Sequence, residues 1–175
     1  LAGVRGVNVT GGQAVVVNSY GQLGLGNTTD YSSPKQIGAL TTWSSVSSGG
    51  YHNAAIKTDG TLWSWGNNTT GQLGDGTLIA KSSPVQIGTG TWSSVNNSSN
   101  NCFGITTSGT LWGWGHNGYG QLGTGDQINK IYATLVATGV DEIKTTAYGS
   151  TTCAAILTGG SIYVTGYIQS GIGGI

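Results

Sequence analysis

The feature that most constrains the fold of this chain is an internal repeat with a period of 49 or 50 residues. Four short motifs recur at this spacing. They are Gly-Gln-Leu-Gly at 21–24, 71–74 and 120–123, Leu-Trp-x-Trp-Gly at 62–66 and 111–115, Trp-Ser-Ser-Val at 43–46 and 92–95, and Ser-Ser-Pro-x-Gln-Ile-Gly at 32–38 and 82–88. Because four separate landmarks keep one period, we predict that the chain is built from copies of one structural unit.

The repeat divides the chain into units at about 1–42, 43–91, 92–139 and 140–175. The similarity weakens toward the ends: Ala133 stands where the first two units have Pro34 and Pro84. We therefore count about three and a half units in one domain. The sequence begins at Leu1 without an initiator methionine or a signal-peptide pattern, and we expect it to be part of a longer polypeptide.

Each unit has the pattern of short strands separated by tight turns. Residues 92–95, 103–106 and 111–115 are rich in aromatic, β-branched or alternating apolar residues, which favours strands. Asp59-Gly60 and Ser108-Gly109 lie between such runs, where hairpins need a residue that tolerates positive φ. The Pro-x-Gln-Ile segment predicts a fourth strand at a sheet edge, where proline is tolerated. The predicted fold is all-β, a partial β-propeller of about three and a half four-stranded blades.

The composite pattern from Tyr51 to Gly74, which contains Trp-x-Trp-Gly at 63–66 and Gly-Gln-Leu-Gly at 71–74, resembles the repeat of the regulator of chromosome condensation family. The resemblance is strong over residues 43–125 and implies a sector of a seven-bladed propeller. The family includes nucleotide-exchange factors, a plant ultraviolet-B photoreceptor, ubiquitin-ligase modules, secreted β-lactamase inhibitors, and phage or bacterial surface proteins. The resemblance therefore implies a fold but does not select one function.

The composition excludes some classes of partner. Only 12 of the 175 residues are charged, six basic and six acidic, which is 7% against about 25% in an average soluble domain. The net charge is zero, so we predict no nucleic-acid partner. The sequence has no run of about 18 apolar residues, and we predict no membrane span.

The repeated apolar side chains are predicted to pack between blades. A tryptophan combines a large apolar area with one N–H that needs an acceptor, and the leucines of the Gly-Gln-Leu-Gly turns are expected to plug the blade junctions. A stacking platform for a carbohydrate or a base is the alternative for the tryptophans and requires exposed rings. The predicted packing residues are Trp43, Trp63, Trp65, Trp92, Trp112, Trp114, Leu23, Leu73 and Leu122.

No catalytic, cofactor-binding or metal-binding residues are predicted, and we expect no enzyme and no cofactor. Cys102 and Cys153 occupy the same position on successive blades, so they are expected to be too far apart for a disulfide and to remain free thiols. His52 and His116 fall at different blade positions, which argues against a metal cluster. The family resemblance implies that His52 lines the blade core.

The predicted function is that of a non-enzymatic structural or recognition module. Low charge and abundant Ser, Thr, Asn and Gly are typical of phage and bacterial surface members of the family. We therefore expect a phage virion protein (tail fibre or decoration) or a bacterial cell-surface protein, located outside the cell or on the virion. The candidate contact loops include 67–70, 77–83 and 126–132. The candidate contact residues are Asn67, Asn68, Thr69, Lys81, Asn117, Tyr119, Asp126 and Lys130.

Two alternatives stay open. A secreted inhibitor of an extracellular enzyme would use exposed aromatic residues and aspartates at one face of the propeller. An intracellular GTPase exchange factor would need charged surfaces, which six basic residues do not supply. The expected partners are proteins, either further blades of the same chain or subunits of a larger assembly, and a glycan or host receptor is a further candidate.

Overall fold

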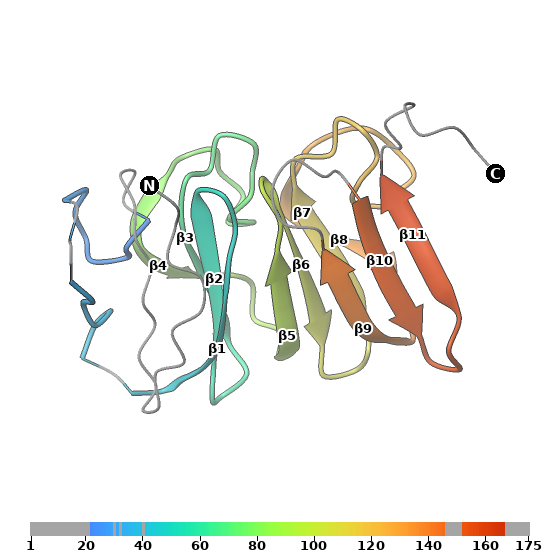
Figure 1. The fold of residues 1–175 in the computed structure, drawn as a ribbon, viewed down its shortest axis with the longest axis horizontal. Coiled ribbons are helices and arrows are strands. Elements are labelled where there is room, and N and C mark those ends of the chain that lie inside the picture. Colours follow the sequence, from blue (N-terminus) through green and yellow to red (C-terminus); the bar gives the residue numbers. More distant parts are fainter. Residues whose placement is uncertain (1–21, 30, 32, 40, 146–151, 167–175) are drawn as a thin grey trace.

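The computed structural model describes residues 22–145, apart from 30, 32 and 40, and residues 152–166 (Figure 1). The described residues form three antiparallel sheets in a row. The first contains β1 (Trp43–Ser48), β2 (His52–Lys57), β3 (Leu62–Gly66) and β4 (Lys81–Gln86). The second contains β5 (Trp92–Asn97), β6 (Asn101–Thr106), β7 (Leu111–Gly115) and β8 (Lys130–Ala137). The third contains β9 (Val140–Thr145), β10 (Thr152–Leu157) and β11 (Ile162–Gly166).

Each sheet is a meander in which strands adjacent in sequence pair with each other. The hairpins between the second and third strands form where the sequence predicts them. Gly60 and Gly109 have positive φ values of 82° and 76°, and their N–H groups donate to the carbonyls of Lys57 and Thr106. These sheets confirm the predicted all-β fold of four-stranded propeller blades, and we call them blades 1, 2 and 3.

The antiparallel order places different connections at the two ends of each blade. Turns 49–51 and 98–100 lie at one end together with the long loops 67–80 and 116–129, which we call the loop face. The hairpins 58–61, 107–110 and 158–161 lie at the opposite end, which we call the hairpin face. In Figure 1 the long loops are at the upper edge of the blades and the hairpins at the lower edge.

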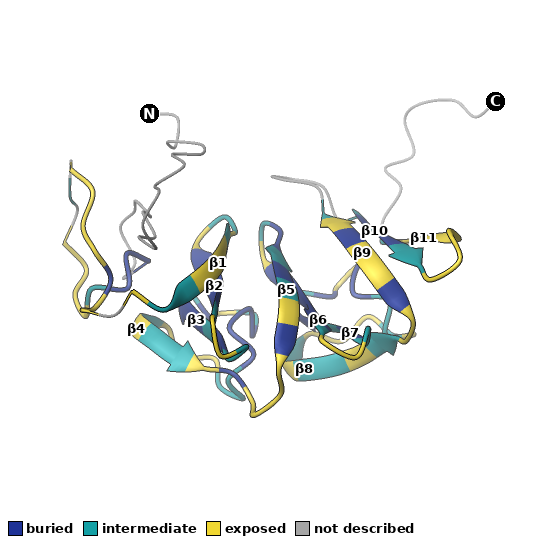
Figure 2. Ribbon diagram, turned by 90° about the horizontal axis from the view of Figure 1, so that it is seen from below, coloured by how far each residue is buried: buried dark blue, intermediate teal, exposed yellow. Residues whose placement is uncertain are grey.

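The core of the described residues lies between blades. One buried cluster joins Ala54, Ile56 and Leu62 of blade 1 to Trp92 and other residues of blade 2. A second cluster joins residues of β6 and β7 to Val140, Ile143 and other residues of blade 3. Figure 2 shows that many buried positions lie on the middle strands of the first two sheets, β2, β3, β6 and β7. Each blade therefore depends on its neighbour for burial of its apolar face.

The described blades form an open row and do not close into a ring (Figure 1). Blade 3 has three strands among its described residues, and the side chains of Ile162, Tyr163 and Val164 on its outer strand β11 are exposed. In the first repeat, the described residues 33–39 form no strand, unlike the edge strand expected there. Completion of the ring by further blades of the same polypeptide stays a prediction. None of the described residues forms a helix long and apolar enough to cross a bilayer.

Candidate functional site

At each junction, a side chain of the blade donates a hydrogen bond to the preceding Gly-Gln-Leu-Gly turn. The indole Nε1 of Trp65 donates to the Gln22 carbonyl at 2.7 Å, and Trp114 Nε1 donates to the Gln72 carbonyl at 3.1 Å. Blade 3 has Thr165 at this position, and its Oγ1 donates to the Gln121 carbonyl at 2.9 Å. The three junctions therefore keep one backbone acceptor while the donor side chain changes.

The glycine after each leucine makes this close approach possible. A Cβ on Gly74 would lie 2.8 Å from the Trp114 ring, and one on Gly24 would lie 2.9 Å from Trp65. Both glycines also have φ near 70°, a conformation that other residues rarely adopt. The glycine therefore leaves room for the tryptophan ring of the next blade to pack against the turn.

The predicted packing residues divide into two groups. Trp65 and Trp114 have no exposed surface, Trp92 is 6% exposed, and the three leucines of the turns are buried. Trp43, Trp63 and Trp112 are only half-buried, so they lie beside the core and not within it. Trp43 contacts Trp65 and Trp63, with ring centroids 6.0 and 6.4 Å apart.

The two long loops of the loop face are organised by buried asparagines. Asn68 Nδ2 donates to Asp75 Oδ1 and to the carbonyls of Thr77 and Ile79. Its Oδ1 accepts the Leu73 N–H. Asn117 occupies the equivalent position in blade 2, where its Nδ2 donates to Thr124, Asp126 and Ile128. Each loop is therefore folded around one amide side chain, which satisfies several backbone groups at once.

The aspartate stands at a different position in each of these two loops, but it makes the same kinds of hydrogen bond and ion pair in both. Blade 1 has Asp75 and Thr77, whereas blade 2 has Thr124 and Asp126 at the matching positions. In both loops the threonine hydroxyl donates to the aspartate. In both loops a lysine also pairs with it, as Lys81–Asp75 at 3.4 Å and Lys130–Asp126 at 2.6 Å.

These contacts hold both carboxyl groups in the ionised form. Burial raises the pKa of Asp75, but hydrogen bonds from Thr77 and Asn68 and the charge of Lys81 outweigh it and leave the pKa below its ordinary value. The hydrogen bond from Lys130 lowers the pKa of Asp126, and the backbone N–H of Ile128 adds to this effect.

The structure corrects part of the predicted contact set. Asn68 and Asn117 are fully buried and organise the loops, so neither is available to a partner. Lys81 and Lys130 are engaged with aspartates, and Asn67 Oδ1 accepts hydrogen bonds from the Thr69 and Gln72 side chains. Thr69 and Tyr119 are exposed.

Sequence reasoning included two exposed isoleucines in the predicted contact loops 77–83 and 126–132 but did not single them out. Ile79 and Ile128 are 65% and 66% exposed and occupy equivalent positions in the two loops. The carbonyl of each accepts a hydrogen bond from the buried asparagine at 3.3 Å, so the backbone beneath each side chain is fixed. The signal that could have found them is their shared position in the repeat.

His52 is a buried ionisable group at the boundary of blades 1 and 2. It is 1% exposed, and among the described residues neither ring nitrogen has a hydrogen-bond partner. The ring packs so closely on Gly49 that a Cβ there would lie 2.4 Å from it. Burial lowers the pKa of His52 to about 4, an effect that the nearby backbone of Asn101 only partly offsets.

Both cysteines are free and buried. Cys102 belongs to the cluster between blades 1 and 2, and Cys153 to the cluster between blades 2 and 3. Burial raises the pKa of the Cys153 thiol to about 12 and raises that of Cys102 well above its ordinary value. No group of three or more potential metal ligands occurs in the described part of the chain.

Comparisons with known proteins agree with this architecture. The sequence model of the regulator of chromosome condensation (RCC1) repeat matches residues 17–56, 59–101 and 108–156. The ultraviolet-B receptor UVR8 of Arabidopsis thaliana is 40% identical over 72 residues, which are 40% of this chain and 16% of the receptor. The mouse X-linked retinitis pigmentosa GTPase regulator is 42% identical over 72 residues, 39% of this chain and 7% of that protein.

A solved structure extends the similarity to the arrangement of the blades. The crystal structure of human WBSCR16 superposes with a TM-score of 0.71 at 26% identity, over 86% of this chain and 41% of that one. This chain thus matches less than half of the length of each of these proteins. The repeat model covers more than half of the chain and the blades have the fold of a solved propeller, so the chain belongs to the regulator of chromosome condensation (RCC1) repeat family.

Proposed function

We propose that this chain is a recognition module that binds a protein or glycan partner through its loop face, on a phage particle or a bacterial surface. The observation that carries the proposal is the paired display of Ile79 and Ile128 on loops whose backbone is fixed from beneath by buried asparagines. Apolar side chains on a fixed backbone favour binding, because little backbone entropy is lost when the partner docks. Tyr119, which is 51% exposed, adds an aromatic contact on the same face.

The distribution of charge supports a partner that is recognised by shape and apolar contact. Three of the described lysines, Lys81, Lys130 and Lys144, pair with carboxylates. The other two, Lys35 and Lys57, lie over aromatic rings. With three of the five described lysines neutralised by carboxylates, the described surface offers little attraction to a phosphate backbone.

Regulation of a GTPase is a second candidate, because one relative is named as a GTPase regulator. It would be tested by adding the chain to a small GTPase loaded with a fluorescent nucleotide. Accelerated nucleotide release would favour this candidate, and an unchanged release rate would count against it.

The binding proposal is tested with a variant that carries Ile79→Asp and Ile128→Asp. The fluorescently labelled chain is mixed with intact bacterial cells of the source's host range, and bound fluorescence is measured before and after digestion of surface protein or glycan. We expect the double variant to bind at least about tenfold less, because each buried carboxylate is costly to desolvate. Ser108→Asp, which adds a charge on the hairpin face, is the control and should bind as the parent does.

Equal binding by the parent and the double variant would contradict the loop-face proposal. The genes that flank the coding sequence test the location independently. Tail or capsid genes would support a virion protein, and a neighbourhood without phage or surface genes would count against it.

A further inference from the structure

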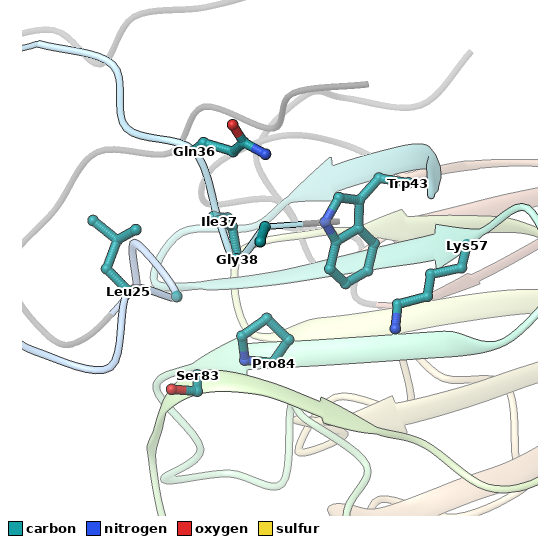
Figure 3. Close-up of a pocket in the computed structure, with 10 residues that line it drawn as sticks. Leu25, Gln36, Ile37, Gly38, Trp43, Lys57, Ser83 and Pro84 are labelled. Atoms are coloured by element: carbon teal, nitrogen blue, oxygen red, sulfur yellow. The ribbon is translucent and has the colours of Figure 1, made fainter. Parts of the chain in front are cut away.

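A cavity of about 560 Å³ opens between residues 24–25 and 36–39 of the first repeat and blade 1 (Figure 3). Its walls are largely apolar and include Leu25, Ile37, Trp43 and Pro84. Lys57 is the one ionisable side chain among its described lining residues. Figure 3 shows the Trp43 ring and the Lys57 chain on the same side of the cavity, with Pro84 facing them. The cavity therefore combines flat apolar surfaces with one cation.

The Lys57 ammonium group has an unusual environment. It lies 3.7 Å from the centroid of the Trp63 ring and 5.2 Å from that of Trp43. These rings attract the cation but offer it no lone pair. Among the described residues no carboxylate forms an ion pair with Lys57, and the nearby Asp59 directs its Oδ1 to the N–H and hydroxyl of Thr61. The three donors of this ammonium group are thus available to an added acceptor.

The equivalent place in blade 2 is built differently. Thr106 stands where blade 1 has Lys57, and Tyr132 stands where blade 1 has Ser83. A Cβ on Gly76 would lie 2.3 Å from the Tyr132 ring, so that ring covers the turn. At Gly26 the nearest atom is only the Ser83 hydroxyl, at 3.4 Å. The blade fold therefore requires neither the lysine nor the cavity, and both occur together in blade 1.

We propose that this cavity binds a small carboxylate that carries a flat apolar group. The carboxylate accepts hydrogen bonds from Lys57 Nζ, and the flat group packs against Trp43 and Pro84. A charge-assisted hydrogen bond is stronger than a neutral one, and an indole face suits a planar ring. The cavity is formed by the first repeat and the sheet of blade 1, and it is distinct from the loops that carry Ile79 and Ile128.

The test uses the 175-residue chain and two matched probes, phenylacetate and its neutral isostere phenylacetamide. Binding is followed by calorimetry and by the change in tryptophan fluorescence. We expect phenylacetate to bind about tenfold more tightly than phenylacetamide, which corresponds to one charge-assisted hydrogen bond. The dipeptide N-acetyl-glycyl-phenylalanine and its amide show whether the natural ligand is a small molecule or the carboxyl end of a polypeptide. A dipeptide acid that binds more tightly than phenylacetate indicates the carboxyl end of a polypeptide.

Two variants assign the binding to this cavity. Lys57→Met keeps an apolar side chain over the tryptophans but removes the ammonium group. It should abolish the preference for phenylacetate over phenylacetamide. Ser83→Tyr copies the residue of blade 2 and should weaken phenylacetate binding at least about tenfold, because the ring occupies the cavity mouth. Lys144→Met removes a lysine from β9 and is the control, with unchanged binding expected.

Equal affinity for phenylacetate and phenylacetamide would overturn the proposal, and so would unchanged binding by the folded Ser83→Tyr variant. Ser83 is exposed, so this second variant keeps the test decisive even if Lys57→Met does not fold.

Discussion

Mild acid is expected to destabilise the junction between blades 1 and 2 through a single histidine. The pKa of His52 is about 4 in the folded chain because the ring is buried, and it returns to about 6.5 when the chain unfolds. Between these values the unfolded state binds the proton more readily, so stability falls as the pH is lowered. From neutral pH the free energy of unfolding should drop by about 2 kcal/mol at pH 5 and by about 3 kcal/mol at pH 4.

The measurement is urea unfolding followed by tryptophan fluorescence at half-unit steps from pH 7.5 to 4.5. His52→Asn is the matched variant, because Asn101 occupies the equivalent position in blade 2 and does not titrate. The comparison rests on the pH dependence of each curve, so a loss of packing that lowers the stability of the variant at every pH does not affect it. Carboxylates titrate mainly below pH 5 and contribute equally to both proteins.

The expected result is a wild-type curve that bends downward below about pH 6.5 and a variant curve that stays flat to about pH 5. Parallel curves for the two proteins would refute the reasoning, because they would show that the folded chain binds a proton at His52 as readily as the unfolded chain does.

Three further outcomes follow from the junctions, the loops and the thiols. Asp75→Thr should cost about 1–3 kcal/mol in urea unfolding, because it removes a largely buried acceptor, whereas adding Thr77→Asp to it should restore stability by reproducing the loop of blade 2; no recovery in the double variant would contradict this. Trp114→Ala should lower the free energy of unfolding by about 3–5 kcal/mol, measured in the same assay, and a loss below about 1 kcal/mol would show that the junction does not depend on the ring. Cys102 and Cys153 should react with a thiol reagent only when the chain is unfolded, because burial disfavours the thiolate; two fast-reacting thiols in the native chain, or a linked pair in a non-reducing peptide map, would contradict this.

Much of the fold could be predicted from the sequence because a repeat fixes many positions at once. The strand predicted at residues 111–115 has the same bounds in the structure, and the hairpin glycines Gly60 and Gly109 occupy the expected turns. The strand predicted at 92–95 extends to Asn97, since its last residues are polar and carry no strand signal. The pairing of Trp65 and Trp114 with turn carbonyls was not predictable, because it depends on how neighbouring blades are placed in three dimensions.

The candidate site was predictable only in part, for a physical reason. Asparagines in a loop are usually solvated, so Asn68 and Asn117 were expected at the surface. Both are buried instead, because their amide groups donate hydrogen bonds to the loop carbonyls around them. The predicted contact loops 77–83 and 126–132 contain Ile79 and Ile128. These two residues were not singled out, because the exposure of a single apolar residue cannot be judged without the backbone that presents it. The cavity beside Lys57 depends on Ser83 being smaller than Tyr132, a difference whose meaning appears only when the two blades are compared.

In the described sector each blade contacts its neighbours through the junctions. The stability of the sector is therefore approximately the sum of one term for each blade and one coupling term for each junction. The first two couplings include an indole that is fully buried against the preceding turn. At the same position the third has the small Thr165 side chain, which buries less apolar area than an indole, so this position couples blade 3 less strongly. The coupling between blades is therefore uneven along the row. Local unfolding should start at blade 3 and stop at the junction of blades 1 and 2, which Trp114 stabilises. Blades 1 and 2 would then unfold together as one cooperative unit.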